Sequence, residues 1–237
     1  MVTIKNVKTL DGQVIDFKTF GKEEVIDAES KLLLIPGLID PHFVLGNNNW
    51  EKNILTAIHG GITTILDLPL HNNNDIPLEQ RIKNVKKCLS DNQMPIEYFS
   101  YFLANGKTIE GVGTKKHTVG LFLHSPKEDE WMRIFQIAAW EDLPLVINLN
   151  HSDRNESFLE KGIHFAENQN TRLYVLNVST ESEMNIIKEA RKRSLLIYCE
   201  TTVKHLNESN AEFLWNALKL GIIETIGTGY SDDEADV

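Results

Sequence analysis

The chain has 237 residues, of which 41% are hydrophobic and 24% are charged, and its formal net charge is −10. This length suits one large α/β domain, and the acidic balance argues against a nucleic-acid partner, which normally requires a basic face. No stretch approaches the roughly 20 apolar residues of a membrane helix, and the N-terminus lacks the pattern of a secretion signal, so we expect a cytoplasmic protein.

Residues 1–37 are predicted to form short β-strands. Val2–Val7 alternates apolar and polar residues, and Asp11-Gly12 is a hairpin turn signal. Val14–Phe20 and Glu24–Ile26 have the pattern of further strands. We therefore treat residues 1–37 as a region of their own.

The stretch Leu32–Gly46 is the one around which the rest of the chain is organised. Its apolar run, bounded by Pro36 and Gly37, predicts a buried strand. His42, in the segment Asp40-Pro41-His42, is then expected where that strand reaches an open end. α/β folds keep their chemistry at such strand ends.

From Ile39 onward, strand-like and helix-like stretches alternate. After the first strand, the predicted strands are Ile62–Leu68, Ile96–Leu103, Val119–Leu123, Pro144–Leu149, Leu173–Val178, Leu195–Glu200 and Ile222–Ile226. The predicted helices are Trp50–His59, Leu78–Leu89, Glu128–Trp140, Phe158–Asn168, one capped by Ser179 or Thr180 with Glu183 in its first turn, and Ala211–Leu220.

Eight strands with helices between them predict an α/β fold, a (β/α)₈ TIM barrel, over residues 38–230. The sequence ends almost on the eighth strand, so we expect the barrel to lack its last helix. Residues 231–237 are expected to form an acidic tail.

Three blocks of sequence resemble a known family. They are PGLIDPH at 36–42, GGITTILDLP at 60–69, and the block from Val178 to Leu206. All three are similar to blocks of the amidohydrolase superfamily, in its dihydroorotase, allantoinase and hydantoinase branch. The resemblance implies a metal-dependent-hydrolase barrel, cyclic-amide hydrolysis, and a small β-domain built from residues before and after the barrel, of which residues 1–37 would be a part.

The resemblance also implies two divalent metal ions, usually zinc, which lower the pKa of a bridging water. The family holds them with a His-x-His pair, a carboxylated lysine, two further histidines and an aspartate. This sequence keeps only the first histidine, His42. At the other positions stand Val44, Gly120, Asn148, Asn177 and Gly229. Gly46 replaces an arginine that grips the substrate, whereas Asn72 matches a substrate-contacting asparagine. We therefore expect a degenerate metal site.

Other polar residues are expected to have surface, capping or structural roles. The remaining candidate histidines are interpreted as surface or capping residues: His71, His117, His124, His151 and His205. Asp40, Asp67 and Glu200 match family carboxylates in structural roles, although Asp40 or Glu200 could hold a lone cation beside His42. Lys115, Lys116, Asp232 and Asp233 are expected to be solvated. Cys88 and Cys199 are expected to be reduced thiols.

The function expected first is a catalytically inactive dihydroorotase-like protein without a cofactor. Non-catalytic homologues in this branch scaffold aspartate transcarbamoylase in pyrimidine synthesis, so that enzyme is the implied partner. One alternative is an active cyclic-amide hydrolase with a rebuilt or mononuclear zinc site, and another is a small-molecule-binding barrel that uses Asn72, Asn148 and Asn177. Because an incomplete eighth βα unit leaves apolar surface uncovered, we also expect a homo-oligomer or a protein partner.

Overall fold

The structure is a computed structural model that describes residues 1–46, 49–69, 77–104, 117–123, 126–150, 156–209 and 211–231. It divides the chain into two compact units, Met1–Leu38 and Ile39–Val237.

The first unit is a three-stranded sheet with the order β2-β1-β3. Its strands are β1 (Val2–Lys8), β2 (Val14–Thr19) and β3 (Glu24–Asp27). The hairpin predicted at Asp11-Gly12 is present: β1 and β2 are antiparallel, and Gly12 has the positive φ of +84° that favours glycine in such turns. β3 pairs in parallel with β1.

The apolar run at Leu32 is not part of the barrel strand, and the prediction from the sequence pattern is wrong there. Leu32 O accepts a hydrogen bond from Lys8 N at 3.0 Å, and Leu34 N donates to Lys8 O at 2.7 Å. This segment therefore extends the small sheet beside β1. The barrel strand begins only at Leu38, after Pro36 and Gly37 have interrupted the pairing.

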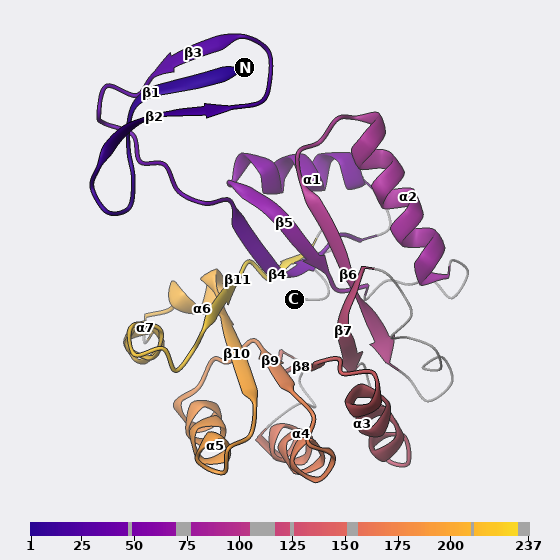
Figure 1. The fold of residues 1–237 in the computed structure, drawn as a ribbon. Coiled ribbons are helices and arrows are strands. Elements are labelled where there is room, and N and C mark those ends of the chain that lie inside the picture. Colours follow the sequence, from indigo (N-terminus) through magenta and orange to yellow (C-terminus); the bar gives the residue numbers. More distant parts are fainter. Residues whose placement is uncertain are drawn as a thin grey trace. The chain divides into compact units, whose positions relative to one another are not determined.

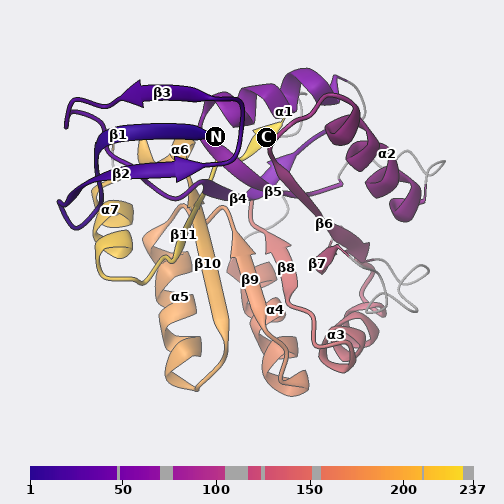
Figure 2. The ribbon, with the colours of Figure 1, turned by 45° about the horizontal axis from the view of Figure 1, so that its top comes forward.

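The second unit is built on one sheet with the order β11-β10-β9-β8-β7-β6-β5-β4-β12 (Figures 1 and 2). Its strands are β4 (Leu38–Val44), β5 (Ile62–Asp67), β6 (Glu97–Ala104), β7 (Thr118–Leu123), β8 (Leu145–Asn148), β9 (Leu173–Leu176), β10 (Ile197–Thr202), β11 (Thr225–Gly227) and β12 (Tyr230–Ser231). The pairings from β5 to β10 are all parallel, as expected for strands joined by helices.

The eighth barrel position is shared by two short strands. β11 pairs with β10, and β12 pairs with β4 on the opposite edge of the sheet. The sheet therefore comes round to its first strand, and the predicted TIM barrel is confirmed. The eighth strand was expected at 222–226 but begins at Thr225, because the preceding residues turn past the end of a helix: Ile222 N and Ile223 N both hydrogen-bond to Ala217 O.

Helices connect the strands and lie outside them, as Figure 1 shows for α3, α4 and α5. They are α1 (Trp50–His59), α2 (Leu78–Asp91), α3 (Trp131–Trp140), α4 (Glu156–Gln169), α5 (Glu181–Lys192), α6 (Val203–Leu206) and α7 (Glu212–Lys219). The apolar residues that recur at helical spacing in α2 and α3 are buried: Leu78, Ile82, Val85 and Leu89 in α2, and Trp131, Ile134, Phe135 and Ala138 in α3. None of the helices in the described ranges is long and apolar enough to span a membrane.

The predicted capping box begins α5. Thr180 Oγ1 accepts a hydrogen bond from Glu183 N at 3.2 Å, and Glu183 Oε2 accepts one from Thr180 N at 3.0 Å. Two backbone donors that the first helical turn leaves unpaired are satisfied in this way. The cap is thus Thr180, one of the two candidates that the sequence offered.

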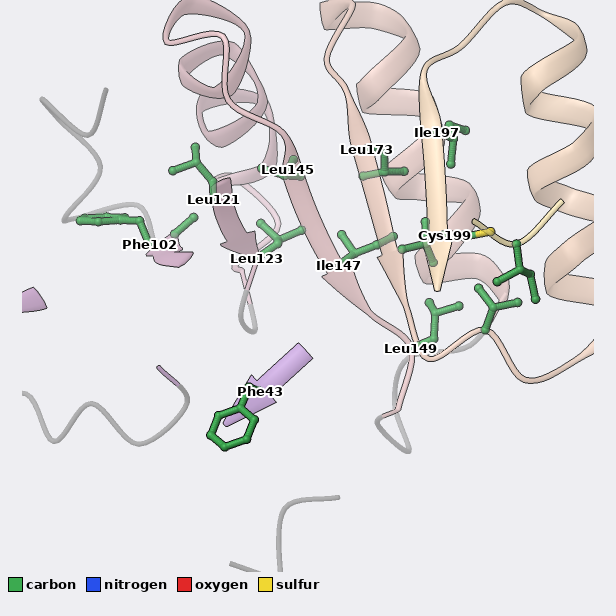
Figure 3. Packing of buried hydrophobic residues seen from close by; sticks show 14 of the residues in the cluster. Phe43, Phe102, Leu121, Leu123, Leu145, Ile147, Leu149, Leu173, Ile197 and Cys199 are labelled. Atoms are coloured by element: carbon green, nitrogen blue, oxygen red, sulfur yellow. The ribbon is translucent and has the colours of Figure 1, made fainter. Parts of the chain in front are cut away.

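The strand residues point alternately outward and inward. The outward set packs against the helices in the main core, and Figure 3 shows part of it, with Leu121, Leu145 and Leu173 labelled. Residues of the opposite parity must face the barrel interior. That parity includes His42 and Glu200, and the inner set defines the candidate site.

Candidate functional site

His42 is the fifth of the seven residues of β4, two residues before the carboxyl end of the strand. Its side chain faces inward, and only 4% of the residue is exposed. The ring Nδ1 is 2.5 Å from Oε1 of Glu200 on β10, a carboxylate with no exposed surface. The one family ligand that the sequence retains is therefore in direct contact with a buried acid.

A second carboxylate, Asp40, lies two residues before His42 on the same strand. Its Oδ1 accepts hydrogen bonds from the backbone N–H groups of His42 and Thr228, each at 3.1 Å. Its Oδ2 accepts the Thr228 hydroxyl at 2.5 Å. Both oxygens of this 3%-exposed carboxylate therefore have protein donors, which compete with any cation for them.

Tyr174 on β9 completes the polar group on the other side of Glu200. Its hydroxyl is 3.2 Å from Glu200 Oε2 and 2.8 Å from Thr225 Oγ1. Both oxygens of the Glu200 carboxylate thus have a partner within the barrel. Strands β4, β9, β10 and β11 all meet at this one acid.

The charges explain the direction of the pKa shifts. Burial alone would lower the pKa of His42, but the charge of Glu200, the hydrogen bond to it and the charge of Asp40 outweigh burial and raise it. The pKa values of Tyr174 and Tyr101 are raised by burial first and by the charge of Glu200 second. The arrangement therefore favours a protonated imidazole between carboxylates, with neutral tyrosines around it.

Gly227 on β11 leaves room for this pair. A Cβ atom at Gly227 would lie 2.6 Å from Glu200 Oε2 and 2.8 Å from the Cβ of His42. Neither distance is possible between non-bonded atoms without displacement. The absence of a side chain at this position is therefore a condition for the contact between His42 and Glu200.

Beside this polar group, the barrel interior contains an apolar cluster. Val44, at the position of the second histidine of the family pair, is 3% exposed and belongs to an inner hydrophobic cluster. The cluster consists of Val44, Leu68, Tyr101, Phe122, Val146 and Leu176. It fills the interior with side chains that offer no metal ligand other than one phenol.

Gly120, which stands at the expected lysine position, is closely surrounded. A Cβ there would lie 2.9 Å from Pro144 O and 3.3 Å from the Tyr101 ring. A lysine could not extend inward from this position without moving Pro144. Phe122, two residues along β7, faces the same side with no exposed surface, and the alternation within Val119–Leu123 could have singled it out as an interior residue.

The two asparagines at the expected histidine positions bond to each other. Asn177 Nδ2 donates to Asn148 Oδ1 at 2.6 Å, and the same oxygen accepts from Asn150 N at 2.9 Å. Both residues are buried, and Asn177 has a φ of +62°, which asparagine tolerates better than most residues. Their hydrogen bond joins the carboxyl ends of β8 and β9.

Gly229, at the expected aspartate position, joins β11 to β12 with a φ of +61°. A Cβ there would lie 3.2 Å from Thr202 Cγ2. The position has no proton-handling group, and its backbone conformation suits the turn between the two short strands.

The implied metal pair does not fit the described residues. Valine and glycine cannot ligate, asparagine is a weak neutral ligand, and His42 is the one imidazole that remains of the family's ligand set. Within the described ranges, no group of three or more His, Cys, Asp and Glu side chains is placed to hold an ion.

Several candidates from the sequence lie outside the described residues. They are Asn72, His71, His124, His151, Lys115, Lys116, Asp232 and Asp233. Among the described histidines, His205 lies in α6, which Thr202 caps by accepting the His205 backbone N–H at Oγ1 over 3.4 Å. The ring of His117 lies beside Phe99, with a centroid separation of 6.0 Å. Cys88 and Cys199 are free thiols, and burial raises the pKa of Cys199 to about 12.

Sequence reasoning missed the role of Arg81. Its guanidinium donates from Nε and Nη2 to Asp67 Oδ2 at 3.1 and 2.9 Å, and from Nη2 to Gly46 O at 2.8 Å. Asp67, expected to be structural, is indeed a buried ion-pair partner. An arginine placed on the apolar face of α2 is the signal that could have revealed this pair, because such a residue must find a counter-charge.

Comparison with known proteins adds independent findings. No family model matches the chain. It is 23% identical over 266 residues to a dihydroorotase of Methanosphaera stadtmanae, covering 90% of this chain and 61% of that protein. It is 25% identical over 201 residues to the multifunctional protein pyr1-3 of Dictyostelium discoideum, covering 75% of this chain and 8% of that protein.

Among solved structures, a D-hydantoinase from Bacillus sp. AR9 superposes with a TM-score of 0.80 at 18% identity, covering 99% of this chain and 70% of that one. The fold is therefore that of the amidohydrolase superfamily. More narrowly, it is the cyclic-amidohydrolase fold, and the sequence is dihydroorotase-like, which confirms the resemblance of the three blocks. The chain spans about three fifths of the dihydroorotase that it matches.

Proposed function

We propose that the chain is a catalytically inactive dihydroorotase-like protein that acts as a structural partner of aspartate transcarbamoylase. The observation that carries the proposal is that the other ligand positions of the family lack metal-binding side chains: Val44 lies in an apolar cluster, and Asn148 and Asn177 hydrogen-bond to each other. His42 is the one family ligand that this sequence keeps. The chemistry of the family needs metal-activated hydroxide, which a single imidazole cannot generate.

The neighbouring side chains support the same proposal. Val44 and Phe122 make the interior apolar, and the amides of Asn148 and Asn177 bond to each other. Gly229 has no carboxylate to accept a proton. A substrate amide would meet neither a hydroxide nor a general base at these positions.

The choice of partner rests on the resemblance to non-catalytic dihydroorotase homologues that scaffold aspartate transcarbamoylase. The match to 8% of a multifunctional protein is consistent with a barrel of this kind working beside other enzymatic units.

Metal content and turnover test the inactivity. The full chain is purified without added zinc, analysed by mass spectrometry for bound metal, and assayed with dihydroorotate and a hydantoin before and after incubation with zinc. We expect no stoichiometric zinc and no turnover. Two equivalents of zinc, with turnover that a chelator abolishes, would overturn the proposal.

The partner is tested separately by sedimentation of the chain with aspartate transcarbamoylase. We expect a complex that sediments faster than either protein alone. If the two proteins sediment independently while turnover is absent, the partner is wrong and the inactivity still holds.

A second candidate is an active cyclic-amide hydrolase with a rebuilt mononuclear zinc site. The retention of a buried, inward-facing His42 favours it. It predicts that activity is lost in His42→Ala and on chelation, but not in His164→Ala, which changes an exposed histidine of α4. If both variants keep the same rate, that rate does not come from this site.

A further inference from the structure

The barrel closes where its sheet is shortest. β11 has three residues and β12 has two, whereas β4 on one side has seven. Among the described residues, two pairs join β12 to β4: Tyr230 with Phe43, and Ser231 with Val44. A ladder of this length provides few backbone hydrogen bonds, so the seam between the first and eighth barrel positions needs other contacts.

Buried side chains supply those contacts. Asp40 on β4 accepts both the backbone N–H and the hydroxyl of Thr228, which lies between β11 and β12. His42 on the same strand contacts Glu200 on β10. The first contact spans 188 residues of sequence and the second 158, so each joins the beginning of the barrel to its end.

Thr228 is itself exposed, but the carboxylate that it binds is 3% exposed. The Thr228 hydroxyl also accepts the Tyr230 backbone N–H at 3.0 Å. The link between the two short strands is therefore anchored on a buried acid, and the same hydroxyl orients the first residue of β12. Charge-assisted hydrogen bonds of this kind are the stronger ones in proteins.

The shape of the seam matches this arrangement. Gly227, next to Thr228, has no side chain, and a Cβ atom there would approach Glu200 to 2.6 Å and His42 to 2.8 Å. Without that atom, β11 can lie close enough to β10 and β4 for all these contacts to form together.

We infer that Asp40, His42, Glu200 and Thr228 form a closure cluster that holds the first barrel strand to the seventh and eighth without a metal ion. The closure cluster gives these four residues a structural role, which the proposed function does not assign to them. It does not depend on the partner, and it concerns the closing of the barrel rather than any reaction.

Hydrogen exchange of backbone amides tests the closure cluster in the full chain. Thr228→Val removes the hydroxyl and keeps the size of the side chain. Thr201→Val is the matched control: it makes the same change on β10, at a buried hydroxyl with no hydrogen-bond partner among the described residues. We expect Thr228→Val to speed exchange at Tyr230 and the neighbouring seam amides by about 10- to 100-fold, with no change in β6 and β7.

The control variant should exchange like the unaltered protein at the seam. If Thr228→Val and Thr201→Val behave alike, or if the faster exchange is spread evenly over the barrel, the closure cluster is wrong. Asp40→Asn provides a second variant that acts on the same contacts from β4. It should speed exchange at the same amides as Thr228→Val.

The same measurement in the presence of a chelator or of added zinc tests the absence of a metal. Seam exchange in the unaltered protein should be the same in both conditions. If zinc slows it, and His42→Gln abolishes that slowing, the cluster holds an ion and closure without metal is overturned. That result can occur without turnover, so it is distinguishable from a failure of the proposed function.

Discussion

Two buried ionic clusters hold this barrel together, and they use different chemistry. In the closure cluster, an imidazole faces the Glu200 carboxylate through one ring nitrogen. In the second cluster, the guanidinium of Arg81 donates twice to Asp67 and once to the Gly46 carbonyl. Asp67 also accepts the Tyr98 hydroxyl at 2.7 Å and the Leu45 N–H at 2.9 Å.

The two clusters differ in the chemistry of their cationic side chains. Arginine carries a permanent charge and several fixed donors, so the cation of the Asp67 cluster keeps its charge and makes several hydrogen bonds. Histidine carries a charge that depends on pH and contacts Glu200 through a single nitrogen. The closure cluster occupies a position where the family binds metal, yet its contacts are those of a structural tie, as in the Asp67 cluster.

The largest effect is expected when the Asp67 cluster loses its cation. Arg81→Met leaves a buried carboxylate without its counter-charge and should lower the free energy of unfolding by about 4 kcal/mol, measured by urea denaturation. The double variant Asp67→Asn with Arg81→Met is the control, and it should recover part of the loss. If the single variant costs no more than an exposed substitution, the cluster has no stabilising role.

The next effect tests the close approach at the seam. Gly227→Ala places a methyl group where Glu200 and His42 meet, and we expect a loss of about 2 kcal/mol from the displacement. Gly60→Ala is a suitable control, because the atom nearest to its added Cβ would be 3.3 Å away and its φ is negative. Equal stability of the two variants would show that the seam has more room than the distances indicate.

A smaller effect is expected in the pH dependence of the unfolding free energy, to which the two clusters should contribute differently. The pKa of His42 is raised above its ordinary value of 6.5, so the protonated pair stabilises the fold fully below that pH. This contribution is lost as the pH rises through the folded-state pKa, and each tenfold gain in the proton affinity of His42 on folding corresponds to about 1.4 kcal/mol. Urea denaturation between neutral and alkaline pH should therefore show stability falling in the unaltered protein.

His42→Gln provides the control for that pH series. It removes the titrating group, so its stability should fall less over the same range. The Asp67 cluster cannot contribute there, because the charge of Asp67 raises the pKa of Arg81 above its already high ordinary value even though burial opposes it. Parallel pH curves for the variant and the unaltered protein would contradict the assignment.

The smallest effect compares two phenols. Tyr98→Phe removes a hydrogen bond of 2.7 Å to Asp67. Tyr174→Phe removes a longer contact of 3.2 Å to Glu200 and a hydrogen bond of 2.8 Å to Thr225, whose hydroxyl keeps a second partner in the Cys199 carbonyl. We expect a loss of about 1.5 kcal/mol for the first and about 0.5 kcal/mol for the second by denaturation. The reverse order would mean that Tyr174 matters more to the closure cluster than its distance suggests.

Much of the fold could be predicted from local patterns. Apolar periodicity placed α1 and the buried faces of α2 and α3, and the Thr180 capping box marked the start of α5. The pattern failed at Leu32, where an apolar run pairs with β1, and at the eighth strand, which is split around Thr228. In both places the partner in the sheet, and not the residue type, decides the structure.

The sequence by itself determined the alternation of strands and helices, the kinship with cyclic amidohydrolases, and the residues that stand at the expected metal positions. Only the tertiary structure decided that His42 meets Glu200, that Asn177 hydrogen-bonds to Asn148, and that Asp40 anchors Thr228. The physical reason is the separation along the sequence. Helix and strand periods act over a few residues, whereas the closure cluster joins groups that are 158 and 188 residues apart. These groups become neighbours only when the barrel closes.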